Sequence, residues 1–74
     1  MSQSFYVKAT WDPEAEVWCS QSDIPGLVIE TATLAEFESL ARHFAPILLG
    51  ENLGIQGSVP IKFEAVGGFE VLAA

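Results

Sequence analysis

The sequence predicts an α+β domain of element order β-β-β-α-β, with one helix packed on one face of an antiparallel sheet. Three observations lead to this prediction. Residues 5–11 alternate between apolar and polar side chains, which is the period of a half-buried strand. The segment DIPGL at 23–27 is a turn, because Pro25 fixes its own φ and Gly26 tolerates a positive φ. The segment TLAE at 33–36 is a capping box that starts a helix.

Three strands are expected before the helix. The first covers residues 5–11, and the second, residues 17–20, runs antiparallel to it because the polar turn at 12–16 is short. The third covers residues 27–30 and completes a meander. Tyr6 and Trp18 are expected on corresponding phases of neighbouring strands, on the sheet face that the helix leaves bare. Simple cross-strand packing and an intermolecular role are equally good interpretations of this pair.

The helix is expected to begin after Thr33 and to be kinked or ended near Phe44 by Pro46, with a further turn at 47–49. Gly50 and Gly54 are both good stop signals. Apolar residues recur at spacings of three and four, so they share one face: Leu34, Phe37, Leu40, Ala41, Phe44 and Leu48.

Beyond the helix, residues 59–65 alternate again and predict a fourth strand, with Pro60 near its start. Gly67 and Gly68 then either turn the chain into a short fifth strand from Phe69 to Leu72 or begin a flexible tail.

Charge and cysteine usage exclude several classes of protein. The net charge is −7, and the three cations, Lys8, Arg42 and Lys62, are too scattered to neutralise the phosphates of a nucleic acid. Cys19 is the only cysteine, which fits a reducing cytoplasm and the role of a small buried hydrophobe. No export signal begins the chain, and the apolar stretch 44–49 is too short to span a bilayer. A cytoplasmic protein without nucleic acid or membrane as a partner is therefore expected.

Chain length predicts one domain over residues 1–74 that needs a partner to be stable. A chain of this size buries only about 60% of its unfolded surface. Half of the residues are nevertheless hydrophobic, which is more than one small core requires. We therefore expect a homo-oligomer.

Catalytic and metal-binding chemistry is not indicated. Asp12, Glu14 and Glu16 form the densest acidic cluster, but they lie in a predicted turn rather than on strand interiors, where carboxylates converge on a cation. His43 is an isolated imidazole on the polar side of the helix, which favours a surface histidine over a catalytic one. We expect a protein that is not an enzyme and has no metal or cofactor.

Residues 5–49 resemble the HicB-like antitoxin domain. The matching features are the opening strand with Lys8, the acidic turn at 12–16, VWCS at 17–20, SDIPGL at 22–27 and ATLAE at 32–36. The pairs Trp11-Asp12 and Val17-Trp18, with the Pro46-containing helix end, are similar to a short bacterial branch catalogued as a domain of unknown function. Unlike full-length HicB proteins, the chain shows no DNA-binding segment.

The resemblance implies a partial RNase H-like fold without RNase H catalysis, and an antitoxin that masks a small basic HicA-like toxin that cleaves mRNA. The toxin is expected to meet the acidic turn and the exposed sheet or a strand edge. The candidate partner-binding residues are Asp12, Glu14, Glu16, Asp23, Tyr6 and Trp18. Two alternatives stay open. One is a stand-alone structural or regulatory oligomer with no toxin, and the other is an enzyme on an RNase H-like scaffold whose acidic turn binds a divalent metal.

Overall fold

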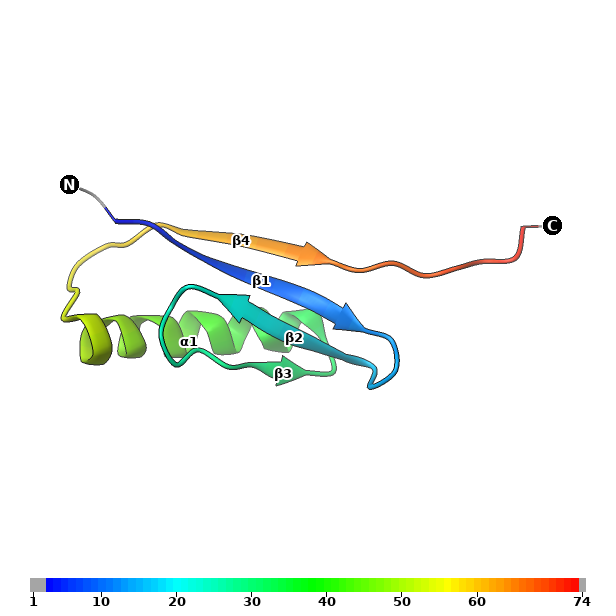
Figure 1. The fold of residues 1–74 in the computed structure, drawn as a ribbon, viewed down its shortest axis with the longest axis horizontal. Helices are drawn as coiled ribbons and strands as arrows, with labels where there is room; N and C mark the ends of the chain where they lie inside the picture. Colours follow the sequence, from blue (N-terminus) through cyan, green and yellow to red (C-terminus); the bar gives the residue numbers. More distant parts are fainter. Residues whose placement is uncertain (1–2, 74) are drawn as a thin grey trace.

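The computed structural model describes residues 3–73, which form four strands and one helix (Figure 1). The elements are β1 (Phe5–Asp12), β2 (Val17–Ser22), β3 (Glu30–Thr31), α1 (Leu34–Leu53) and β4 (Ile61–Val66). This confirms the α+β class and the order β-β-β-α-β.

The strands form one sheet in the order β3-β2-β1-β4, and α1 packs on one of its faces (Figure 1). β1 and β2 pair antiparallel, as do β2 and β3, whereas β1 and β4 pair parallel. The sheet is therefore mixed rather than purely antiparallel as expected. The parallel pair arises from α1, which carries the chain back to the end of the sheet where β3 began. β4 therefore runs in the same direction as β3 and β1.

The predicted start of the helix is confirmed. Thr33 is the N-cap, and its Oγ1 accepts a hydrogen bond from the Glu36 N–H at 3.2 Å. Of the two expected stop signals, Gly54 is the one that ends the helix: it adopts φ 65°, and its N–H donates to the Gly50 carbonyl.

Pro46 neither ends the helix near Phe44 nor separates off a further turn, because α1 continues to Leu53. The proline removes one helical hydrogen bond. The turns that follow it carry Leu49, which is buried, and Leu48, which packs against the core. This tertiary packing outweighs the local preference of proline.

The core lies between α1 and the helix-facing side of the sheet. It consists of Val7, Ala9, Ile24, Leu27, Ile29, Phe37, Ala41, Ala45 and Leu49. The buried stripe of α1 is therefore rotated from the predicted one, with Ala45 and Leu49 buried while Leu40 and Phe44 stay 37% and 42% exposed. The small side chains at 41 and 45 allow the helix to lie close to the sheet, and this approach fixes the rotation.

The third strand is shorter than predicted. Residues 27–29 supply buried side chains at Leu27 and Ile29, but only Glu30 and Thr31 form strand β3. The Ser20 N–H donates to the Ile29 carbonyl at 3.0 Å, but the Ile29 N–H donates to the Ser20 Oγ at 2.8 Å, so a side chain takes one place of the backbone ladder here.

The C-terminal part is less covered by the helix than the rest of the sheet, although the ring centroid of Phe63 lies 6.0 Å from that of Phe37 on α1. β4 begins at Ile61, and all six of its residues are exposed. Residues 67–73 continue as an extended segment past the end of the sheet (Figure 1). They form no fifth strand with the described part of the chain, so of the two predicted outcomes the one without a strand is found. We call residues 67–73 the tail.

Candidate functional site

The acidic turn joins β1 to β2, and its shape is set by Asp12. The Asp12 Oδ1 accepts hydrogen bonds from the N–H groups of Glu14 at 3.0 Å and Ala15 at 3.3 Å, and its carbonyl accepts one from the Glu16 N–H at 2.8 Å. Asp12 therefore builds the turn. Glu14 and Glu16 are exposed and point their charge to solvent, as predicted.

Strand pairing adds a fourth carboxylate that the sequence analysis missed. Cys19 lies opposite Thr10 on one side and opposite Glu30 on the other, so all three face away from the helix. Asp12 is two residues after Thr10 and shares that face. We call Asp12, Glu14, Glu16 and Glu30 the acidic hairpin end. Glu30 is distant from the turn in sequence, and only the β2–β3 register brings it there.

Each of the three cations has a carboxylate close by, away from the acidic hairpin end. The Arg42 Nε lies 3.6 Å from the Glu38 Oε2 on the surface of α1. Lys8 lies opposite Glu64 in the β1–β4 pair, and Lys62 is two residues before Glu64 on the same face. The acidic hairpin end is therefore the part of the sheet where negative charge is uncompensated.

Asp23 does not join this acidic surface. Its Oδ1 accepts a hydrogen bond from the Tyr6 N–H at 2.9 Å, near the start of β1. Asp12 is the last residue of β1, so the two carboxylates are roughly 20 Å apart along the strand. Beside Asp23, the Ser22 Oγ donates to the Tyr6 carbonyl at 2.6 Å and accepts from the Ile24 N–H at 3.0 Å. Asp23 therefore holds the start of the DIPGL turn against β1.

Tyr6 and Trp18 lie on opposite faces of the sheet, so the prediction that they share the bare face is wrong. Trp18 is opposite Trp11 in the hairpin and packs against the core cluster, and its ring is tilted by 56° to that of Trp11 with centroids 5.3 Å apart. Tyr6 neighbours Val7, which points into the core, and therefore faces away from the helix. We call the sheet face that points away from α1 the open face. Tyr6 can contact a partner on the open face, whereas Trp18 lies on the face that α1 covers.

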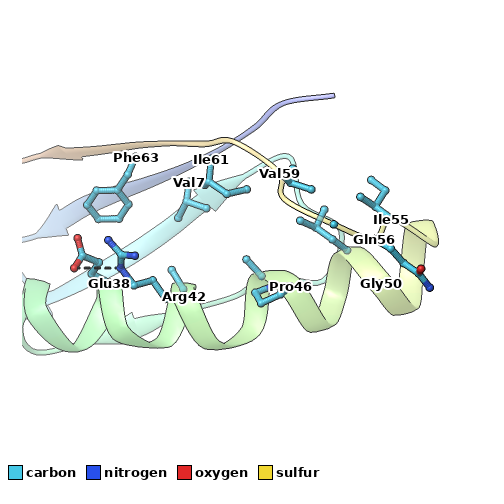
Figure 2. Close-up of a pocket in the computed structure, with 14 residues that line it drawn as sticks. Val7, Glu38, Arg42, Pro46, Gly50, Ile55, Gln56, Val59, Ile61 and Phe63 are labelled. Carbon is cyan, nitrogen blue, oxygen red and sulfur yellow. Dashed lines mark ion pairs between the residues drawn. The ribbon is translucent and has the colours of Figure 1, made fainter. Parts of the chain in front are cut away.

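A second surface feature is an apolar groove of about 760 Å³ between α1 and β4 (Figure 2). Ile61 and Phe63 of β4 point into it together with Val59, and the Glu38–Arg42 ion pair lies on the helix below Phe63 (Figure 2). The helical floor is formed by Ala41, Ala45, Pro46, Leu49 and Gly50. We call this the β4 groove.

The single histidine lies on α1, and the single cysteine lies on the sheet face that points away from the helix, opposite Glu30. His43 packs edge-on against Phe44, with ring centroids 4.8 Å apart. Cys19 is half-buried on the open sheet face rather than buried as expected. Within residues 3–73, no three His, Cys, Asp or Glu side chains come together as metal ligands would. In the same residues, no helix is both long and apolar enough to cross a bilayer.

Comparison with known proteins gives a family and a similar structure. The family described as "Domain of unknown function (DUF1902)" matches residues 4–70. The crystal structure of the hypothetical protein TTHA1013 from the extremely thermophilic bacterium Thermus thermophilus is similar with a TM-score of 0.75 and 37% sequence identity. That alignment covers 93% of this chain and 100% of the other. No curated protein matches the sequence.

Proposed function

The chain belongs to the DUF1902 family, and from this premise and the charge distribution on its sheet we propose that it is an antitoxin-type binding module. It would mask a small basic, RNA-cleaving protein of the HicA type, and would have no catalytic activity of its own. The HicB-like sequence resemblance over residues 5–49 suggests this class of partner. The observation that carries the proposal is the uncompensated acidic hairpin end.

Electrostatics gives this surface a specific use. On a chain of net charge −7, four carboxylates at the hairpin end of the sheet, two on its open face and two in the turn, attract and orient a cationic protein. Tyr6 lies on the same face and offers an aromatic ring with a polar end. The acidic side chains of such a surface would occupy the basic residues with which an RNA-cleaving protein holds phosphates.

Co-expression with the small basic protein encoded beside this chain tests the proposal. We expect a complex that co-purifies, and rescue of growth when the basic protein is toxic by itself. The double substitution Glu14→Gln and Glu30→Gln should weaken the complex roughly tenfold, mainly through slower association, and added salt should narrow the difference from the wild type. Binding would be measured by surface plasmon resonance at two ionic strengths.

Glu51→Gln is the control for the loss of a single charge, to be compared with Glu14→Gln and Glu30→Gln made separately, because Glu51 lies in the last turn of α1, away from the acidic hairpin end. Asp12 is left unchanged since its carboxylate builds the turn. If the Glu14→Gln, Glu30→Gln variant binds as tightly as the wild type while Glu51→Gln binds more weakly, the placement of the site is refuted. Absence of any complex with the encoded neighbour would refute the antitoxin role.

A second candidate function is a stand-alone structural or regulatory oligomer with no toxin. The exposed β4 and its apolar tail favour this candidate, because they are suited to self-association whether or not a toxin exists. Inspection of the neighbouring genes separates the two: a HicA-like reading frame supports the first candidate, and an isolated gene supports the second.

A further inference from the structure

The chain exposes more surface than a compact monomer of its mass would. Its accessible surface is 5525 Å², whereas a compact monomer of 8.0 kDa exposes about 4,450 Å². The excess, on the order of 1,000 Å², is similar to the roughly 800 Å² that each partner buries in a dimer of standard size. The excess has a clear source, because β4 is exposed throughout and the tail extends past the sheet (Figure 1).

The exposed surface is apolar and regular in pattern. Phe69, Val71 and Leu72 of the tail are 90%, 77% and 100% exposed. β4 is the last strand of the sheet, so its outer edge has unpaired backbone N–H and C=O groups. An exposed hydrophobic edge strand of this kind is a template for pairing with another chain.

We propose that two copies of the chain pair antiparallel along β4 and the tail, so that the tail of each copy lies along β4 of the other and fills its β4 groove. The result is a continuous sheet of eight strands with both helices on one face. This dimer surface is separate from the acidic hairpin end, and the proposal does not depend on the proposed function.

The alternation of side chains determines which tail residues reach the groove. Ile61 and Phe63 lie opposite Phe5 and Val7 of β1 and face the helix. In an extended chain, Phe69 and Val71 fall on the same face as Ile61 and Phe63, because every second residue points the same way. Gly67 makes this path possible: a Cβ there would lie 2.8 Å from the Trp11 Cβ.

Charge then selects one register. With Val66 opposite Val66 of the second copy, Phe69 lies beside Phe63, Val71 beside Ile61, and Lys62 opposite Glu70. Symmetry forms each of these pairs twice, and opposite charges facing each other across strands stabilise the pairing. The occupant of the groove is therefore a second copy of this chain.

A shift of the pairing by two residues keeps each side chain on the same face of the sheet, and both such registers are less favourable. A shift of two residues in one direction places Glu64 opposite Glu70, and like charges directly opposite destabilise a pair of strands. The opposite shift places Glu70 opposite Pro60, which has no N–H to donate, and places Lys62 directly opposite Gly68, which has no charge to pair with it.

Sedimentation equilibrium of the full chain at micromolar concentrations tests the dimer. The wild type should be a dimer, and Phe69→Asp with Val71→Asp should raise the dissociation constant by at least about 100-fold. Both tail positions are exposed and outside the core, so circular dichroism should show an unchanged fold. Phe44→Asp is the control: Phe44 is an exposed aromatic residue of α1 that does not line the β4 groove, so the dimer should stay intact.

A charge exchange tests the register. Lys62→Glu alone and Glu70→Lys alone should each weaken the dimer roughly tenfold, and the double variant should restore it. Val66→Cys in a Cys19→Ser background should form an intermolecular disulfide on oxidation, because the two Cα atoms would be within bridging distance. Glu70→Cys in the same background should not.

Several outcomes would overturn the proposal. The first is a monomeric wild type, whether its tail is free, folded on its own groove, or bound only to a different protein. The second is a dimer that persists in the Phe69→Asp, Val71→Asp variant. The third is the loss of the dimer in a Phe44→Asp variant that is still folded. A double charge variant that is no tighter than the single ones would refute this register.

Discussion

Gly26 shows how one residue of the DIPGL turn serves the packing of the helix. It adopts φ 84°, and a Cβ at this position would lie 3.3 Å from the Leu48 Cδ2 and 3.4 Å from the Asn52 Nδ2. The Asn52 Nδ2 also donates a hydrogen bond to the Pro25 carbonyl at 3.0 Å. The turn is therefore fastened to the last turns of α1, which explains the motif by structure rather than by chemistry.

Gly26→Ala should lower the free energy of unfolding by about 1–2 kcal/mol, because an L side chain is strained at positive φ. For a domain of this size, each kcal/mol lowers the Tm by roughly 4–8 °C. Thermal unfolding followed by circular dichroism would measure the change. Gly68→Ala is the control, since a Cβ there meets no atom within 4 Å. Equal Tm values for the two variants would contradict the assigned role of Gly26.

The helix start is a local device, and its contribution can be isolated. Thr33→Ala removes the Oγ1 that accepts from the Glu36 N–H and should cost about 1 kcal/mol of stability, whereas Thr33→Ser keeps a hydroxyl acceptor and should cost less. Urea denaturation of both variants would compare these free energies. If both lose the same amount, the hydroxyl is not what caps the helix.

Local signals were sufficient to predict the elements, but the relations between them were not visible. The strand period of residues 5–11 and the cap at Thr33 depend on neighbours in sequence, and both predictions are confirmed. The phase of β2 against β1 depends on the turn, where Glu16 adopts φ 56° and Asp12 pairs with Val17. That register places Trp18 opposite Trp11, which the sequence analysis did not foresee.

The helix face and the candidate site follow the same rule. Several apolar stripes are available on α1, and the close approach allowed by Ala41 and Ala45 selects one of them. The turn carboxylates of the acidic hairpin end were predictable because they are neighbours in sequence. Glu30 and the β4 groove were not, because strands distant in sequence create them. Most of the elements, but only part of the site, could therefore be predicted.

The dimensions of the described chain agree with a protomer that is completed by assembly. Its radius of gyration is 14.4 Å, whereas a compact domain of this length has about 11 Å. The longest extent is 53 Å against 22 and 16 Å for the other two, and the tail lies along that long direction (Figure 1). Among the described residues, six of the eleven large hydrophobic side chains that stay exposed thus lie on β4 and the tail, which the single helix covers only in part.

Stability that depends on assembly must depend on concentration, and this gives the last prediction. If folding and the pairing of β4 with the tail are coupled, a hundredfold rise in protein concentration stabilises the folded dimer by about 2.7 kcal/mol, so the Tm should rise by several degrees. The Phe69→Asp, Val71→Asp variant cannot bury its tail and should keep one Tm over the same range. Thermal unfolding by circular dichroism in cells of different path length measures both. If folding and dimerisation are coupled, mass action requires the Tm to rise with protein concentration. A wild-type Tm independent of concentration would therefore show that α1 and the sheet are stable without a second copy.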